Sequence, residues 1–394
     1  MTFNINTARA DTPACENIIH FNNAGAALMP LPVSHCLHDY LNKEQQFGGY
    51  ETADKEQALI DNFYHAHAML LNCQPSEIAF AENATRALNM AFYSFTFKAG
   101  DRILTTLSEY GSNIIAYLHH AKRFDAEVVF VPNDEFGQID TQALKAMIDE
   151  RVKLITISHI PTGGGLVNPA AEIGRIANAA NIPFLLDAAQ SIGQIPLDVK
   201  QLGCDILVGT GRKYLRGPRA TGVLYVRQGL LETLTPPLID QYAATLISPT
   251  EYTLRNDAKR FETWEQNLAY KAALGVAVDY ALAIGLESIQ QRIYHLAALL
   301  RAHLSGIDGV QLTDDGIEKC GIVTFFTQQA NANNIKQQLA AKNINVTTPQ
   351  GSGNLVSFEH RGLSVLVRAS VHYYNTENEI DTFIKVLKRI LSTS

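Results

Sequence analysis

Seven short apolar runs dominate the chain between about residue 75 and residue 226. They are nearly continuous in hydrophobic residues, whereas a strand with one face in water alternates apolar and polar positions. Helix-like stretches such as 169–180 separate the runs. This alternation predicts an α/β domain around a mostly parallel, seven-stranded sheet that is covered on both faces. The runs lie at 77–82, 101–106, 127–132, 153–160, 182–188, 205–210 and 221–226.

The pattern changes after a Pro- and Thr-rich passage at 234–250. Two helical patterns follow, at roughly 267–285 and 286–305, and short strands then alternate with helices to the C-terminus. This order predicts a second, smaller α+β domain. We therefore divide the chain into an N-terminal arm that packs on the small domain (1–18), a large domain (19–255) and a small C-terminal domain (256–394).

Composition and charge narrow the class of protein. The chain has 394 residues, of which 46% are hydrophobic, so it is long enough for a large core. A net charge of −7 argues against a nucleic-acid surface, and no apolar run is long enough to span a bilayer. The first residues do not resemble a signal peptide, and five scattered cysteines form no disulfide framework. We expect a cytoplasmic protein that binds neither nucleic acid nor membrane.

Polar residues follow several of the predicted strands, at the edge where open α/β sheets bind ligands. Asp187 ends one run, and Lys213 follows the next in a glycine-rich turn. Desolvation in such a turn lowers the pKa of an ammonium group, and a partly neutral lysine forms a Schiff base with an aldehyde. An acid at the same edge can keep a pyridinium nitrogen protonated. The alternatives are a solvated surface lysine and a helix-capping aspartate.

An anion site and a ring-binding site are predicted at the same edge. The helix start at 83–85 offers unpaired N–H groups and the Thr85 hydroxyl to a phosphate, and Thr210 and Arg212 add a hydroxyl and a cation. Ordinary capping is the alternative at each of these positions. Tyr110 is placed to stack on a ring, although a tyrosine near a strand end is also a common core residue.

Arg368 lies inside an apolar strand, LSVLVRASV (363–371). An arginine in this setting needs an anionic partner, which is either a structural carboxylate or the carboxylate of a substrate. Rival motifs are weak, because PTGGGLVNP (161–169) lacks GxGxxG spacing and the arginine of GTGRKY (209–214) interrupts a Walker loop. Since no HExxH or similar ligand spacing occurs, no metal site is predicted.

Together these motifs resemble the class V aminotransferase family of fold-type-I pyridoxal-phosphate enzymes. The matching stretches are NAT (83–85), SEYGSN (108–113), DAAQ (187–190), GTGRK followed by GP (209–218) and VRASVHYYNTENEID (367–381). The family includes cysteine desulfurases, selenocysteine lyases, isopenicillin-N epimerase-like proteins and hercynylcysteine sulfoxide lyases. The likeness runs from FNNAGAALMP (21–30) to the C-terminal helix. It implies pyridoxal 5'-phosphate as cofactor and the two-domain architecture of fold type I.

The resemblance also implies roles for single residues. Lys213 matches the Schiff-base lysine, Asp187 the acid at the pyridine nitrogen, and Gln190 the partner of the cofactor's phenolic oxygen. Tyr110 matches the stacking residue and is a candidate for assisting proton transfer. The implied phosphate ligands are Ala84, Thr85, Thr210 and Arg212, and the implied substrate contacts are Arg368, which matches the carboxylate-binding arginine, and the loop residues Asn23, Ala24 and Gly25.

Three departures from the family pattern bear on function. Cysteine desulfurases carry a mobile cysteine shortly before the carboxylate-binding arginine, and 345–368 contains none, which disfavours a desulfurase. His159 stands where relatives place an asparagine near the cofactor, and is a candidate for the substrate site. In the arm 260–267, which in this family reaches the partner subunit's phosphate, Glu265 stands where many relatives have threonine, and Gln266 is the alternative contact.

The resemblance therefore implies a homodimeric pyridoxal-phosphate enzyme that acts on a small amino acid, with 260–267 near the other subunit's site. The segment GRKYLRGP (211–218) is one residue longer than in cysteine desulfurases. In this length, and in FGGYETAD (47–54) and SEYGSN, the chain resembles the sulfoxide-lyase and epimerase-like branch. The expected reaction is β-elimination from an S-substituted cysteine or its sulfoxide, giving pyruvate and ammonia. A class V aminotransferase or epimerase is the alternative, and a cysteine desulfurase is the disfavoured one.

Overall fold

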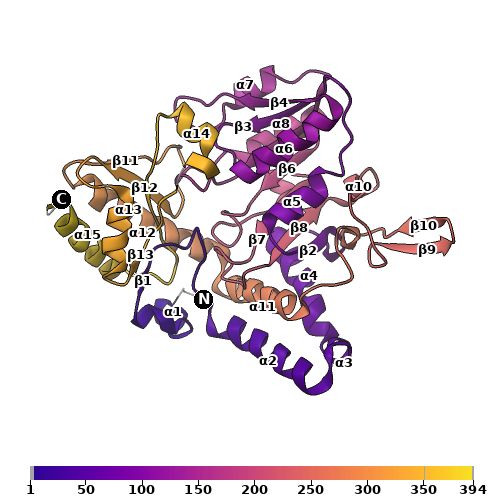
Figure 1. The fold of residues 1–394 in the computed structure, drawn as a ribbon, viewed down its shortest axis with the longest axis horizontal. Coiled ribbons are helices and arrows are strands. Elements are labelled where there is room, and N and C mark those ends of the chain that lie inside the picture. The colour runs from indigo at the N-terminus through magenta and orange to yellow at the C-terminus, as the bar shows by residue number, and fades with distance from the viewer. Residues whose placement is uncertain (1–3, 350, 393–394) are drawn as a thin grey trace.

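The computed structural model describes residues 4–349 and 351–392, and a seven-stranded sheet lies at its centre (Figure 1). In spatial order the strands are β2 (Ile78–Ala81), β8 (Gly222–Val226), β7 (Ile206–Thr210), β6 (Phe184–Asp187), β5 (Val152–Ser158), β3 (Arg102–Thr106) and β4 (Glu127–Val131). All neighbours from β7 to β4 are parallel, whereas β8 is antiparallel to both β7 and β2. The predicted mostly parallel sheet of seven strands is confirmed.

Alternate residues of each strand enter two separate cores, which explains the continuous apolar runs. On β6, Phe184 and Leu186 pack in the first core and Leu185 in the second. The first core is covered by α4 (Gln57–Leu71), α8 (Ala170–Ala179) and α11 (Leu268–Ile284), and the second by α5 (Ala84–Phe92) and α6 (Gly111–Phe124). Because neither face of the sheet meets water, the strands carry no period-two polar signal.

Shorter elements surround this sheet. A hairpin of two antiparallel strands, β9 (Ala244–Ser248) and β10 (Glu251–Leu254), projects from the body of the molecule (Figure 1). The remaining helices of this part are α2 (Leu31–Phe47), α3 (Gly49–Lys55), η2 (Pro75–Glu77), α7 (Thr141–Ala146), α9 (Val199–Leu202), α10 (Gln228–Leu231) and η3 (Ala258–Phe261).

The predicted smaller α+β domain is also present. Its antiparallel sheet has the order β11 (Val310–Leu312), β12 (Ile322–Thr327) and β14 (Val367–Ser370), and α12 (Leu286–Ser305), α13 (Ala332–Ala340) and α15 (Glu377–Ser392) pack around it (Figure 1). The strand β13 (Ile344–Asn345) pairs in parallel with β1 (Ile19–His20), so the N-terminal segment joins this part. The other elements are α1 (Ile5–Ala10), η1 (Pro13–Glu16), η4 (Gly351–Gly353) and α14 (Leu355–His360).

The boundaries of the arm and the two domains stay a prediction. Arg9 of α1 lies 2.7 Å from Glu379 of α15, which places the arm against the C-terminal helix. However, α11, which the sequence division assigns to the small domain, packs against α2 and α4 of the N-terminal half, whereas α12 packs against β11, β12 and α15.

Two long helices, α11 and α12, follow each other directly, and Gly285 between them has a φ of 92°, which glycine adopts without strain. The two helices are bent by 79° relative to each other at this break. Within 4–349 and 351–392, no single helix has the length and apolar composition of a membrane span. Among these residues, only α11 and α12 taken together have that length and composition.

A buried ion pair ties α11 to the segment before it. Lys271 Nζ lies 3.0 Å from Glu262 Oε2, and the two side chains are 2% and 0% exposed. Tyr64 of α4 donates its hydroxyl hydrogen to Glu262 over 2.9 Å, and the side-chain oxygen of Gln266 accepts from Lys271 at 3.0 Å. Gln266 is thus held by residues of its own chain.

A Lys271→Met variant is expected to lower the free energy of unfolding by about 3–5 kcal/mol, because the buried Glu262 carboxylate then loses its cation. Urea denaturation measures the change. The Lys271→Met/Glu262→Gln double variant is the matched control, and it should recover much of the loss because no unpaired charge remains. A double variant as unstable as the single one would contradict this explanation.

Candidate active site

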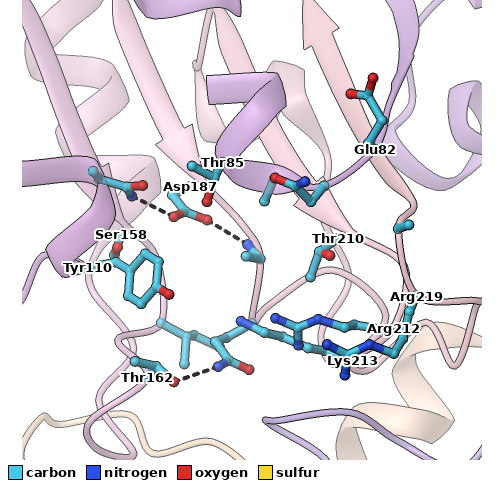
Figure 2. Close-up of a pocket in the computed structure, with 17 residues that line it drawn as sticks. Glu82, Thr85, Tyr110, Ser158, Thr162, Asp187, Thr210, Arg212, Lys213 and Arg219 are labelled. Atoms are coloured by element: carbon cyan, nitrogen blue, oxygen red, sulfur yellow. Dashed lines mark hydrogen bonds between the residues drawn. The ribbon is translucent and has the colours of Figure 1, made fainter. Parts of the chain in front are cut away.

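The carboxyl ends of β2, β5, β6 and β7 open into one cavity of about 290 Å³ (Figure 2). Because β8 is antiparallel to both of its neighbours, β2 points the same way as β7, and all four strands end at the same edge of the sheet. The cavity is lined by Glu82, Asn83, Ala84, Thr85, Tyr110, Asn113, Ser158, Ile160, Thr162, Asp187, Ala189, Gln190, Thr210, Arg212, Lys213, Arg219 and Ala220.

Every residue that the sequence suggested as a cofactor ligand lies in this wall. These residues are Ala84, Thr85, Tyr110, Asp187, Gln190, Thr210, Arg212 and Lys213. The suggested substrate residues Arg368, Asn23, Ala24, Gly25 and His159 lie behind the wall and do not line it. The structure therefore brings the two predicted sets together in one region, while the role of each residue stays a prediction.

Asp187 is an oriented carboxylate without a cation. It ends β6 and is 7% exposed. Its Oδ1 accepts a hydrogen bond from Ala189 N at 2.8 Å, and its Oδ2 accepts from Asn113 Nδ2 at 2.7 Å. No lysine, arginine or histidine of the described residues lies within 4.0 Å of it. A buried carboxylate of this kind favours a positively charged ligand group.

Lys213 lies in the turn that follows β7. The turn is closed by a hydrogen bond from Gly217 N to Gly211 O at 2.8 Å. Burial, and then the charge of Arg212, lowers the pKa of Lys213 to about 7. Its ammonium group makes no hydrogen bond to another residue in the described part of the chain. Near neutral pH a large fraction of Lys213 is therefore an uncharged amine, as a nucleophile or a general base requires.

Another part of the cavity wall is suited to an anion. Helix α5 begins at Ala84, and Asn83 caps it by accepting a hydrogen bond from Arg86 N at 2.8 Å. The first amide groups of the helix have no partner within it. Figure 2 shows the Arg212 and Arg219 side chains beside each other, with Thr210 above them. Burial and the neighbouring Arg219 charge lower the pKa of Arg212, so the two cations repel each other until an anion enters.

Arg368 is a buried guanidinium with neutral partners. It lies on β14 and is 6% exposed. Its NH1 group donates to Thr162 O at 2.9 Å and to Thr162 Oγ1 at 2.5 Å, and NH2 lies 3.5 Å from Asn22 Oδ1. Nε has no partner in the described residues. Burial lowers the pKa of Arg368 to about 10. Nε and NH2 lie on one edge of the guanidinium, and such an edge can bind a carboxylate in a two-pronged manner.

Thr162 joins two of the predicted residues. The Gln190 side-chain amide donates to Thr162 Oγ1 at 3.0 Å and to Ala24 O at 3.1 Å, and the same threonine hydroxyl accepts from Arg368. The Gln190 Oε1 atom has no partner in the described residues. Sequence reasoning missed Thr162 because it treated 161–169 as a weak dinucleotide motif. Its position in the loop that follows β5, at the carboxyl edge of the sheet, was the available signal.

His159 and the 22–25 loop support the wall from behind. His159 is 5% exposed, its Nδ1 lies 3.1 Å from Ser191 Oγ, and burial lowers its pKa to about 4, so it is neutral. The Asn23 side chain donates to Ser370 O at 2.8 Å. The carbonyl oxygens of Ala24 and Gly25 accept hydrogen bonds from Gln190 and Arg212. These contacts position cavity residues and leave the predicted substrate contacts untested.

Comparisons with known proteins agree with this arrangement. The model of the aminotransferase class-V family matches residues 19–383. A probable cysteine desulfurase of Methanothermobacter thermautotrophicus is 30% identical over 393 residues, which cover 97% of each chain. The apo structure of a cysteine desulfurase from Thermococcus onnurineus NA1 has a TM-score of 0.93 and 26% identity, and the match covers 100% of this chain and 99% of that one.

A structure of a cystine C–S lyase in complex with its product, cysteine persulfide, has a TM-score of 0.86 and 24% identity, and the match covers 96% of this chain and 99% of that one. At this identity the likeness concerns the fold. The predicted fold-type-I architecture is confirmed by these structures. The chain belongs to the class-V aminotransferase family of pyridoxal-phosphate-dependent enzymes.

Proposed function

We propose that this protein is a C–S lyase that uses pyridoxal 5'-phosphate to remove the sulfur substituent of an S-substituted cysteine, or of its sulfoxide, by β-elimination. One observation carries the proposal. The buried Arg368 guanidinium has neutral partners only among the described residues, and it lies next to a cavity that holds Lys213 and Asp187. An amino-acid substrate brings the carboxylate that Arg368 lacks and an amine that can replace Lys213.

The residues of the cavity fit the charges of the cofactor. Asp187 lacks a cation, which a pyridinium nitrogen supplies. Arg212, Arg219 and the start of α5 lack an anion, which a phosphate supplies. Tyr110, 38% exposed in the cavity wall, offers an aromatic face to the ring. When bound, pyridoxal phosphate supplies an electron sink for charge that develops at the substrate Cα.

Arg368 holds the substrate in this proposal. Its Nε and NH2 groups bind the two oxygens of the α-carboxylate, while NH1 stays bonded to Thr162. The carboxylate thereby replaces the 3.5 Å contact of NH2 with Asn22, and it displaces the atoms that cover the buried Nε. Because the guanidinium is fixed by Thr162, the Cα–H bond of the substrate is presented in one orientation.

Lys213 moves the proton. The incoming amine frees its side chain, and its lowered pKa lets the uncharged amine take the Cα proton. The electron pair of the Cα–H bond forms a double bond between Cα and Cβ. The electron pair of the Cβ–S bond leaves with the sulfur atom. With one water consumed, the products are a thiol (from a sulfoxide, a sulfenic acid), pyruvate and ammonia.

A cysteine desulfurase is the second candidate, because similar curated proteins carry that name. That activity needs a cysteine which accepts sulfur near the substrate. No cysteine occurs between 345 and 368, and none lines the described cavity. Cys15, Cys204 and Cys320 are buried, which leaves Cys36 and Cys73 partly exposed. These facts favour elimination to pyruvate over sulfur transfer to the enzyme.

The test is incubation of the holoenzyme with S-methyl-L-cysteine sulfoxide and an assay of pyruvate by lactate dehydrogenase. We expect stoichiometric pyruvate and ammonia, and we expect iodoacetamide treatment to leave the rate unchanged because no thiol takes part. Keto-acid exchange without pyruvate would identify an aminotransferase. Racemisation without pyruvate would identify an epimerase, and alanine formation from cysteine that iodoacetamide abolishes would identify a desulfurase.

We also propose a homodimer in which 260–267 lies near the partner's site. In this segment Trp264 is 60% exposed and Glu265 is exposed, so both are available for contact. Of the two candidate contacts to the partner's phosphate, Gln266 is bonded to Glu262 and Lys271 of its own chain, so Glu265 is the one that is free to reach a partner.

A further inference from the structure

Glu109 is a second buried carboxyl group behind the cavity wall. It follows β3, directly before Tyr110, and is 1% exposed. It does not line the cavity. No lysine, arginine or histidine in the described part of the chain lies within 4.0 Å of it. A buried carboxyl group without a cation is costly, so its position calls for a functional explanation.

The two oxygens of Glu109 have different surroundings. Oε1 accepts from Tyr110 N at 2.8 Å, from Asn113 Nδ2 at 2.9 Å and from Ser158 Oγ. Oε2 has one long contact, 3.4 Å, with Thr105 Oγ1. Because the donors converge on Oε1, a proton bound by this group sits on Oε2. The site therefore accommodates both the ionised and the neutral form.

Asn113 bridges Glu109 to Asp187. Its side-chain nitrogen donates one hydrogen to Glu109 Oε1 at 2.9 Å and the other to Asp187 Oδ2 at 2.7 Å. The second of these bonds is drawn in Figure 2. Both hydrogens of the amide are thereby used, so its orientation is fixed. The two carboxyl groups therefore accept hydrogen bonds from one and the same amide nitrogen.

The charges around this pair link Glu109 to the cavity. Burial, and then the Asp187 charge, raises the pKa of Glu109 to about 7. The titratable groups that face the pair are Tyr117 of α6, whose pKa is raised by burial and by Glu109, and Lys213 beyond Asp187. None of these supplies a fixed positive charge, so the cation that the pair lacks must come from the ligand.

We propose that Glu109 is a positioning residue which, through Asn113, sets how strongly Asp187 holds the proton on the ring nitrogen of the bound cofactor. The inference rests on the proposed place of Asp187 beside that nitrogen. An ionised Glu109 adds negative charge behind Asp187 and makes loss of the ring proton harder. A neutral group at the same place makes it easier, and the electron sink is then weaker.

The test is ¹⁵N NMR of the holoenzyme loaded with pyridoxal phosphate labelled at the ring nitrogen, recorded against pH. The ring-nitrogen shift reports protonation directly and does not depend on which reaction the enzyme performs. Glu109→Gln keeps the shape of the side chain and removes its charge. We expect this variant to release the ring proton at a pH about one unit lower than the unmodified protein, a tenfold change in the equilibrium.

Two further variants calibrate the size of the change in the ring-nitrogen titration. Asp187→Asn should lose the ring proton over the whole range. Ser158→Ala removes one donor to Oε1, keeps Glu109 protonated to higher pH, and should shift the ring titration in the same direction as Glu109→Gln by a smaller amount.

Equal titrations in the unmodified protein and Glu109→Gln, both with native circular dichroism, would overturn this inference while the proposed function stands. An unprotonated ring nitrogen at every pH in the unmodified holoenzyme would instead remove the role of Asp187 on which both depend.

Discussion

A Lys213→Ala variant is expected to lose the visible absorbance of bound pyridoxal phosphate and to lose turnover by about 10⁴-fold. The variant removes the buried amine with a pKa of about 7, which is proposed both to bind the cofactor and to move the Cα proton. Absorbance after gel filtration in excess cofactor and steady-state pyruvate formation measure the two effects.

Lys122→Ala is the matched control for this variant. Lys122 lies exposed on α6, near its end and outside the cavity, so its removal should leave both measurements unchanged. If Lys213→Ala kept its colour and turnover, the assignment of the cavity as the catalytic site would be wrong. If both variants lost cofactor, the effect would be one on folding, which circular dichroism would reveal.

An Arg368→Leu variant is expected to keep the cofactor absorbance and to lose kcat/KM by about 10²- to 10³-fold, because a buried guanidinium that pairs with a carboxylate contributes several kcal/mol to binding. Arg368→Lys keeps the positive charge but cannot form two parallel hydrogen bonds to a carboxylate. Its kcat/KM should lie between those of the unmodified protein and Arg368→Leu. An S-substituted cysteamine carries the same sulfur leaving group but has no carboxylate. Its turnover should be the same in the unmodified protein and in Arg368→Leu.

The result that contradicts this role is an Arg368→Leu enzyme with an unchanged KM for the amino acid. Loss of cofactor from the same variant would place Arg368 among the residues that hold the fold, through Thr162 and the Gln190 amide, rather than among those that hold the substrate.

The sheet and its functional edge were predictable because each depends on local sequence. Continuous apolar runs reflect strands that are buried on both faces. Asp187 is the last residue of β6, and Lys213 lies in the turn after β7. The carboxyl ends of parallel strands meet at one edge, so the meeting of both residues in one cavity followed from topology.

The remaining partners were not predictable because they come from contacts between distant parts of the chain. Thr162 receives hydrogen bonds from Gln190 and from Arg368, which is 206 residues away in sequence. Arg219 lines the cavity only because its loop folds back beside Arg212. In the sequence Glu109 is an ordinary polar loop residue, and only the structure shows that Asn113 links it to Asp187 by hydrogen bonds.

The wall around the cavity is assembled from both ends of the polypeptide. Ser370 on β14 is bonded to Phe21 and Asn23, and Ala24 and Gly25 fix Gln190 and Arg212 from behind. During synthesis on a ribosome, Lys213 and Asp187 therefore emerge well before Arg368. The contacts of 21–23 with β14 can form only after Ser370 has been synthesised, so this part of the wall closes after the point at which β6 and β7, which position Asp187 and Lys213, can pair.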